Sequence, residues 1–394
     1  GPFNREKIWH PFSPETPAYI VPPIDNIADG PSGLTYYPGT GLSDEFKNWF
    51  MLVDFRGGPS NSGIRLVKVK PKGAFWEIER NEQLIWNILA TDADFGPDGA
   101  LWVCDWVNGW VGEGKGRIYR FFNPETRAQP IVAEVEQLLK VGFRQLPPER
   151  LGALLSHQDR RIRSGAQWEL AARSISSEFE KLADDSSGDP LGRLHATWGL
   201  AQIARLQAAQ RTVMAGKLAG LLTDSDPFIR AAAAGGLGDA TVPAGGIGDN
   251  PMKRYESQLV ALIGDSDPRV RYAAALACGK LQLASAFDPV CRLLSDNADS
   301  DPAIRHAGIM ALRGAPDATR IVELNQHPSR SVRLAAIVAL RKRQDPRLAV
   351  FLSDSDVGVQ TEAARAINDV PELHGALAAL AALTRQSNLP EPLL

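Results

Sequence analysis

The sequence is poor in the residues that most enzyme classes need for their chemistry. Its 394 residues include three cysteines, and no two of them form a Cys-x-x-Cys pair, so the usual zinc and haem-attachment patterns are absent. His10 is the only histidine before residue 157, and no Gly-x-Ser-x-Gly motif occurs, so nothing indicates nucleophilic catalysis. We expect Cys278 and Cys291 to be buried free thiols, because they lie in or beside apolar helical patterns. The sequence alone offers no catalytic residue and no metal-ligand set.

Neither sign of charge is in excess, and long apolar runs are missing. The chain has 43 basic and 46 acidic residues, which lacks the positive balance that binding to nucleic acid or a membrane surface usually needs. No apolar run reaches the roughly 18 residues of a membrane span. We therefore expect neither a nucleic-acid partner nor a membrane span. The Gly1-Pro2 start is typical of the residue left by a tag-cleaving protease, so we expect a piece of a longer protein.

The stretch from Asp92 to Phe121 alternates runs of β-forming residues with tight-turn signals such as Pro97-Asp98-Gly99. A similar order of turns and aromatic runs occurs upstream. The predicted strands are 92–95, 100–105 and 116–121, with an upstream copy at 30–37, 49–56 and 63–67. One such meander cannot bury both faces of its sheet, and repeated meanders are typical of β-propeller blades. We predict a partial β-propeller of about two blades over residues 30–130, after a Pro-rich irregular lead-in over residues 1–29.

From about Ala133 the apolar residues follow a helical period of 3.6. The phrase Asp-Pro-x-apolar-Arg then recurs, ending at arginines 230, 271 and 305, with looser copies ending at 163, 193, 333 and 360. The Asp can cap a helix whose first residue is the Pro, since that position needs no N–H donor. This pattern resembles the short form of HEAT-type repeats. We predict an α-solenoid of about seven helical pairs over residues 131–394, making the chain a β plus α multidomain protein.

Two features of the helical part leave alternatives open. The recurrent Arg230, Arg271, Arg305 and Arg333 could line a groove for an anionic partner, or could pair with acidic groups of adjacent repeats and hold the stack in register. The Gly-rich stretch at residues 235–250 could cradle a phosphate, but no Gly-Lys-Ser/Thr follows it. We expect a flexible loop between repeats there.

The predicted blades carry candidate polar and aromatic site residues. Asp54 and Asp105 stand at equivalent places, each ending an inner strand before an aromatic residue. They could form a site at a tunnel mouth, or hydrogen-bond between blades. Trp106 and Trp110, with Trp49, could stack on a sugar ring or pack in the core. No EF-hand pattern surrounds the aspartates, so the sequence does not indicate calcium binding through that motif.

Residues 24–121 resemble the last two blades of soluble quinoprotein sugar dehydrogenases, the sorbosone and aldose dehydrogenase group. The similarity lies in residues 29–33 ahead of a Tyr strand, in residues 51–57 followed by an Ile-Arg strand, and in residues 92–101. The order of blades and then HEAT repeats resembles the large dehydrogenase-like proteins of planctomycetes, which continue into a c-type cytochrome domain.

The resemblance implies a set of roles. It places Arg56 where the family has a quinone-contacting lysine and keeps an aspartate at Asp92, with Asp54, Asp105 and Trp106 at the tunnel mouth. Leu89 and Thr91 stand where two arginines are expected. It further implies pyrroloquinoline quinone and calcium in the parent protein, a sugar substrate, a cytochrome partner, and a periplasmic or secreted location. The catalytic histidine belongs to earlier blades, so the chain itself should be inactive and bind no cofactor alone.

These features support more than one function. The first hypothesis is the carboxy-terminal part of a quinoprotein-like aldose or sorbosone dehydrogenase. The alternative, favoured by the two missing arginines, is a non-catalytic scaffold that binds carbohydrate or protein. A third makes the solenoid the surface that binds a redox partner.

Overall fold

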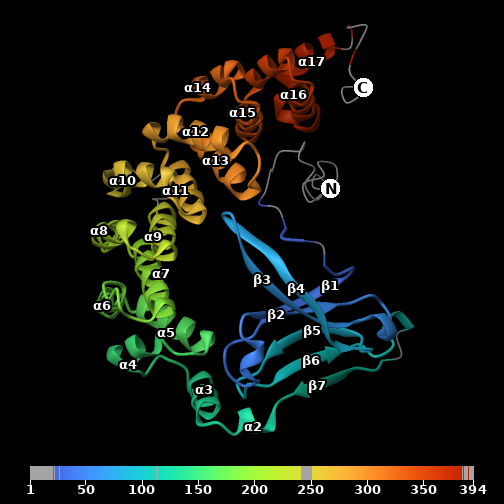
Figure 1. Ribbon diagram of the computed structural model, residues 1–394, viewed down its shortest axis with the longest axis vertical. Helices are drawn as coiled ribbons and strands as arrows, with labels where there is room; N and C mark the ends of the chain where they lie inside the picture. The colour runs from blue at the N-terminus through green and yellow to red at the C-terminus, as the bar shows by residue number, and fades with distance from the viewer. Residues whose placement is uncertain are drawn as a thin grey trace. The chain divides into compact units, whose positions relative to one another are not determined.

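The computed structural model describes residues 21, 23–25, 27–111, 114–240, 251–383, 385 and 389. Most of the predicted lead-in, and residues 241–250 of the predicted glycine loop, lie outside the described residues. Along the chain, two sheets come first and helices follow (Figure 1). Residues 24–72 with 76–200 form one compact unit, and the helices from Ala201 onward form most of a second.

In the part of the chain that the structure describes, seven strands form two sheets in which sequential strands are neighbours. The strands of the first sheet are β1 (Pro31–Tyr36), β2 (Trp49–Asp54), β3 (Gly63–Lys72) and β4 (Phe75–Trp86), and those of the second are β5 (Ala90–Phe95), β6 (Leu101–Asp105) and β7 (Arg117–Phe121). The pairings of β1 with β2, β2 with β3, β5 with β6 and β6 with β7 are antiparallel. All six predicted strands are present, and β4 was not predicted.

Both sheets contribute to one hydrophobic core, because the alternation of each strand turns every second side chain inward. Met51, Val53 and Ile64 of the first sheet cluster with Phe95 and Val103 of the second. In the described part of the chain the two sheets are small and open, and neither closes into a ring. The structure therefore shows two small antiparallel sheets and gives no support to a propeller.

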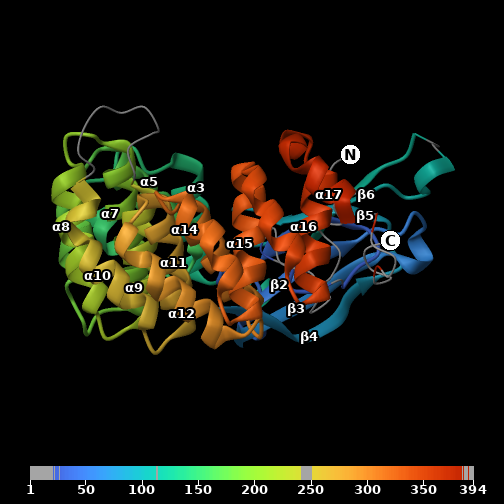
Figure 2. The same cartoon turned by 90° about the horizontal axis from the view of Figure 1, so that it is seen from above.

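Within the described residues, the helices after the sheets follow one another in seven successive pairs, where the sequence predicts about seven. After α2 (Pro124–Arg127) and α3 (Pro130–Val141), the pairs are α4 (Pro148–Leu154) with α5 (Arg160–Ala172), α6 (Ser177–Ala183) with α7 (Pro190–Leu206), α8 (Arg211–Gly220) with α9 (Pro227–Asp239), α10 (Glu256–Ala261) with α11 (Pro268–Leu281), α12 (Phe287–Asn297) with α13 (Pro302–Gly314), α14 (Ala318–Glu323) with α15 (Arg330–Arg343), and η9 (Pro346–Ser353) with α16 (Val357–Asp369). The segments η10 (Pro371–Ala376) and α17 (Leu377–Leu383) follow. In the second unit, α9, α11, α13, α15 and α16 pack one against the next. Figure 2 shows α9, α11, α15 and α16 following one another in this order.

Aspartate caps begin the second helix of most pairs, as the recurring phrase predicts. The Asp226 carboxylate accepts a hydrogen bond from the Phe228 N–H at 2.8 Å, and Asp267 accepts one from Arg269 at 2.8 Å. Asp301 accepts bonds from the N–H groups of Ala303 and Ile304. These bonds satisfy backbone donors that have no partner within the helix, so the phrase fixes where these second helices start.

Removing one cap gives a first testable result. We expect Asp226→Ala to lower the free energy of unfolding by about 1 kcal/mol, because the Phe228 N–H loses its acceptor. Urea denaturation followed by circular dichroism measures the change. The control is Ser329→Ala, since Ser329 precedes α15 but makes no side-chain cap bond. An equal loss in both variants would show that the cap bond is not the cause.

The loop prediction is wrong for residues 235–239, because α9 continues to Asp239. Glycine allows close helix packing here. A Cβ on Gly236 would lie 2.7 Å from the Ala201 side chain, and one on Gly238 would lie 2.8 Å from the Ala277 backbone. The benefit of this close approach outweighs the low helix propensity of glycine.

Candidate functional site

The arginine that ends the recurring phrase connects its own repeat to the next one. Arg230 donates from Nη1 to the carbonyls of Asp224 (2.8 Å) and Ser225 (3.1 Å), in the turn before its helix. Its Nε and Nη2 donate to the two carboxylate oxygens of Asp265, at 3.0 and 2.9 Å. Asp265 belongs to the following helical pair, so the arginine forms a bidentate inter-repeat ion pair.

Arg333 has the same geometry at another repeat boundary. Its Nη1 donates to the carbonyls of His327 and Pro328, at 2.9 and 3.1 Å. Its Nε and Nη2 donate to Asp354 of the next pair, at 2.7 and 3.2 Å. At these two boundaries the structural interpretation of the arginines, as groups that hold the stack in register, is therefore confirmed.

The inter-repeat ion pairs also set the charge state of their aspartates. Burial opposes ionisation of Asp265, but the hydrogen bonds from Arg230 outweigh it and lower the pKa of that carboxyl. Asp265 also accepts the N–H of Asp267 at 2.8 Å. Its negative charge is thus fully engaged within the protein.

The pattern breaks at the boundary between α11 and α13. Asp265 lies six residues before Arg271, and the equivalent residue of the following repeat is Asp299, six before Arg305. There the backbone turns through two left-handed residues, Ala298 and Asp299, with φ of 44° and 61°. The Asp299 carboxylate accepts the Ser331 hydroxyl at 2.7 Å and lies 3.8 Å from Arg305. Asp299 therefore bonds at the boundary between α13 and α15 and does not pair with Arg271.

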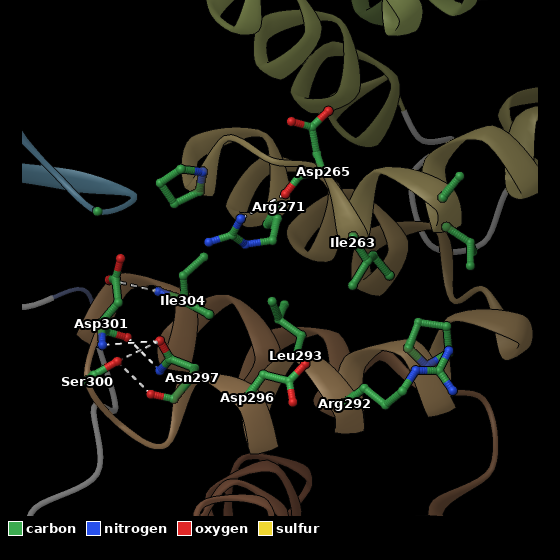
Figure 3. A pocket seen from close by; sticks show the side chains of 16 residues that line it. Ile263, Asp265, Arg271, Arg292, Leu293, Asp296, Asn297, Ser300, Asp301 and Ile304 are labelled. Atoms are coloured by element: carbon green, nitrogen blue, oxygen red, sulfur yellow. Dashed lines mark hydrogen bonds between the residues drawn. The ribbon is translucent and has the colours of Figure 1, made fainter.

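Among the described residues, Arg271 consequently makes only the two hydrogen bonds to backbone carbonyls and lacks the two to a carboxylate that Arg230 and Arg333 make. Its Nη1 donates to the carbonyls of Asp265 (2.7 Å) and Ser266 (3.0 Å). No carboxylate of the described residues binds its Nε and Nη2. The Arg271 side chain is half-buried and lines a pocket between the two helical pairs (Figure 3).

The pocket has an apolar floor and a polar rim. Its apolar side chains Ile263, Leu293 and Ile304 are 3%, 8% and 2% exposed, so they form a fixed surface. Around them stand Arg271 and Arg292, the hydroxyl of Ser300, and the carboxylates of Asp265, Asp296 and Asp301 (Figure 3). One wall comes from α10, α11 and the turn between them, the other comes from α12, α13 and the turn between them, and Gly73 of the turn between β3 and β4 also lines the pocket. Within the described residues, no group of three or more His, Cys, Asp or Glu side chains could hold a metal ion.

A second hollow lies at the carboxy-terminal ends of α11, α13 and α15. Its charged lining residues are Lys280, Arg313, Lys342 and Arg343. Lys280 forms an ion pair with Asp239, and Arg343 donates to the carbonyls of Arg313 and Ala315 at 2.8 and 2.7 Å. Cations in the last turn of a helix stabilise its partial negative charge. These contacts account for Lys280 and Arg343 as helix-end groups.

The predicted site residues Asp54, which is buried, and Arg56, which is partly exposed, meet in an ion-pair cluster. Arg56 donates to Asp54 at 3.1 and 2.9 Å, and Arg65 of β3 donates to the same carboxylate at 2.8 Å. Burial opposes the ionisation of Asp54, but these hydrogen bonds outweigh it and lower its pKa. Arg56 also pairs with Asp29 at 2.8 Å. The sequence interpretation missed Arg65, although its strand was one of the predicted ones.

Trp106 lies beside this ion-pair cluster. Asp92 and Asp105 each accept a hydrogen bond from a nearby backbone N–H group. Trp106 stacks on Phe55, with ring centroids 6.0 Å apart, and meets Trp110 edge-on at 5.0 Å. Asp105 is buried and accepts the Val107 N–H at 2.8 Å, while Asp92 accepts the N–H of Ala93 at 2.9 Å. The structure thus brings Trp106 next to the residue that follows Asp54. Any binding role for these residues stays a prediction.

Two of the three cysteines are buried, as predicted. Burial raises the pKa of Cys278 to about 12 and that of Cys291 to about 11, so both thiols stay protonated and unreactive at neutral pH.

None of the helices in the described ranges is both long and apolar enough to span a bilayer.

Comparison with known proteins gives one family match. Residues 218–313 match the family model for HEAT repeats. This range runs from α8 into the last turn of α13 and includes every residue that lines the pocket except Gly73. No curated protein matches the chain.

Solved structures resemble the chain only distantly. YibA of Escherichia coli is 21% identical, with 68% of this chain and 94% of that chain covered and a TM-score of 0.39. The CpcE–CpcF complex of phycocyanin lyase from Nostoc is 16% identical, with 61% and 95% covered and a TM-score of 0.34. Human deoxyhypusine hydroxylase is 20% identical, with 61% and 90% covered and a TM-score of 0.28. With TM-scores below 0.5, none of these likenesses assigns an activity.

The resemblance to quinoprotein sugar dehydrogenases is wrong, and so is the hypothesis that the chain is part of one. The family match lies wholly in the helices and identifies HEAT repeats, while the two sheets are small and open. A sugar substrate and a cytochrome partner have no support. The residues that suggested the resemblance are turn and strand residues, which many antiparallel sheets share.

Proposed function

We propose that this chain is a non-catalytic scaffold that binds a protein partner through its helical repeats. The observation that carries the proposal is the pocket between α10–α11 and α12–α13, whose lining residues, apart from Gly73, lie inside the HEAT-repeat match. Stacked helical repeats form extended surfaces that suit a partner protein. An apolar floor with a polar rim is the usual anatomy of a protein interface.

The engagement of the surrounding polar groups supports binding over chemistry. Asp265 is held by Arg230, and one carboxylate oxygen of Asp301 caps α13. The apolar side chains Ile263 and Leu293 can accept a partner side chain and remove it from water, which stabilises a complex by about 25 cal/mol per Å² of apolar surface buried.

The test uses a substitution that fills the pocket without disturbing the repeats. Gly264 lines the pocket, and a Cβ added to it meets no atom within 4 Å. Peptides are selected from a random library on the full chain, and their affinities are measured by fluorescence anisotropy. We expect Gly264→Phe to weaken the selected peptides roughly tenfold, the loss of one well-packed contact.

The matched control is Gly220→Phe, at the end of α8 one repeat earlier, where the added side chain also enters open space. It should leave peptide affinity unchanged. If Gly264→Phe binds the selected peptides as tightly as the wild type does, the pocket is not the binding site.

A further inference from the structure

We propose that Arg271 is the receptor for a carboxylate of the partner, an Asp or Glu side chain that replaces the missing inter-repeat aspartate. This inference rests on the proposed function and names the chemistry of the segment that the pocket accepts. It follows from a comparison of three arginines at equivalent positions in their repeats: Arg230, Arg271 and Arg333.

The three guanidinium groups are held in the same way. Each uses Nη1 to bind the two carbonyls that lie six and five residues earlier in its chain. In Arg230 and Arg333 this fixes the Nε and Nη2 edge so that it binds one carboxylate through two hydrogen bonds. Arg271 is oriented by the same two bonds, so its edge is prepared for a carboxylate before any ligand arrives. Preorganised donors bind more tightly, because little side-chain freedom is lost on binding.

The acidic residues at or near the position that should pair with Arg271 already bind other groups. Asp265 is bound by Arg230, and Asp299 receives the Ser331 hydroxyl. One oxygen of Asp301 accepts two N–H groups of its helix. Neither these carboxylates nor any other carboxylate of the described residues bonds to Arg271, so we expect a carboxylate of the partner to complete its bonding.

Exposure distinguishes Arg271 from the equivalent arginine of an earlier repeat. Arg163 also donates from Nη1 to two carbonyls of the preceding turn, at 2.7 and 3.0 Å. Its side chain is only 8% exposed, so a ligand cannot reach its remaining nitrogens. Arg271 is half-buried on the wall of an open pocket. Partial burial strengthens an ion pair relative to one in bulk water, while the pocket leaves a path for the ligand.

The apolar floor of the pocket determines which kind of side chain can lie next to the partner's carboxylate. Ile304 and Leu293 lie next to Arg271 and Ile263 in the same hollow (Figure 3). A segment that places its Asp or Glu on Arg271 brings an adjacent side chain onto these aliphatic groups. The fitting partner is thus a peptide segment with an acidic residue beside an aliphatic one.

The experiment uses peptides selected on the full chain that lose affinity for Gly264→Phe. We expect these peptides to contain Asp or Glu beside an aliphatic residue. Replacing that acid by its amide should weaken binding to the unaltered protein roughly tenfold to hundredfold, the range for a bidentate charge-assisted contact. On Arg271→Gln the acid and amide peptides should bind equally, and Arg271→Lys should restore part of the difference. Arg313→Gln, at the other basic hollow, should change nothing.

The outcomes separate the two proposals. Because the amide peptide is measured on the wild-type chain, the test stands even if Arg271→Gln fails to fold. Pocket-dependent peptides that bind equally as acid and amide overturn the role of Arg271 and leave the scaffold proposal intact. If no selected peptide depends on the pocket, both proposals fail.

Discussion

Gly279→Val is expected to lower the free energy of unfolding by about 3 kcal/mol, the upper end of the usual cost of overpacking. Gly279 lies in α11 where α13 approaches most closely. A Cβ at this position would stand 2.8 Å from both the Ala311 Cα and the Met310 carbonyl oxygen. Both are backbone atoms, so no side-chain rotation can relieve the contact. The two helices must separate, and the hydrophobic contact between α11 and α13 loosens.

The matched control is a helical glycine with open space around it. A Cβ on Gly235 of α9 would meet nothing within 4 Å. Gly235→Ala should therefore raise the free energy of unfolding by about 0.5–1 kcal/mol, the difference in helix propensity. Thermal and urea denaturation compare the two variants. A neutral Gly279→Val would contradict the packing described for α11 and α13.

Glu362→Gln is expected to stabilise the folded chain above pH 8. Glu362 is 4% exposed in α16, and its Oε1 finds no hydrogen-bond partner among the described residues. Burial raises its pKa to about 8, against a smaller lowering by Arg365, which lies 3.7 Å away. The folded chain therefore holds a proton that the unfolded chain releases near pH 4.5.

The direction of the pH effect follows from this difference. The contribution of Glu362 to stability is fully present below pH 4.5 and is lost as the pH rises to about 8. Each unit of pKa shift corresponds to about 1.4 kcal/mol, so the substitution should gain a few kcal/mol above pH 8 and little below pH 4.5. Urea denaturation across this pH range measures the difference. Glu323→Gln, an exposed residue of α14, is the control. A gain that is the same at all pH values would show that folding does not raise the pKa of Glu362.

The helical pairs could be predicted from sequence because their signals are local. The cap and the proline of Asp226-Pro227 act within one turn, and the spacing of such phrases gave the number of pairs. Strand β4 could not be found in this way, since its alternation is of charged residues. Lys68 pairs with Glu79 at 3.2 Å and Lys72 with Glu77 at 2.9 Å, contacts that exist only once β3 and β4 are paired.

The pocket itself lies beyond what the sequence pattern shows. The Asp-Pro-x-apolar-Arg phrase that ends at Arg305 is complete, so the sequence predicts a regular repeat there. What changes is the turn before it, where Asn297 holds the Asp301 N–H at 3.1 Å and Asp299 adopts a left-handed conformation. Local propensity does not fix such a turn, because the bond from Ser331 of the next repeat also determines where Asp299 points. The missing partner of Arg271 therefore becomes visible only in three dimensions.

The most direct test of the scaffold proposal is hydrogen–deuterium exchange of the full chain with and without a selected peptide. Amides that become unprotected only on local opening report where a ligand stabilises the fold. We predict that the peptide slows exchange in residues 260–271 and 289–304, which form the two walls of the pocket. Protection confined to other segments, such as the carboxy-terminal ends of α11, α13 and α15, would contradict the assignment of this pocket as the partner-binding site.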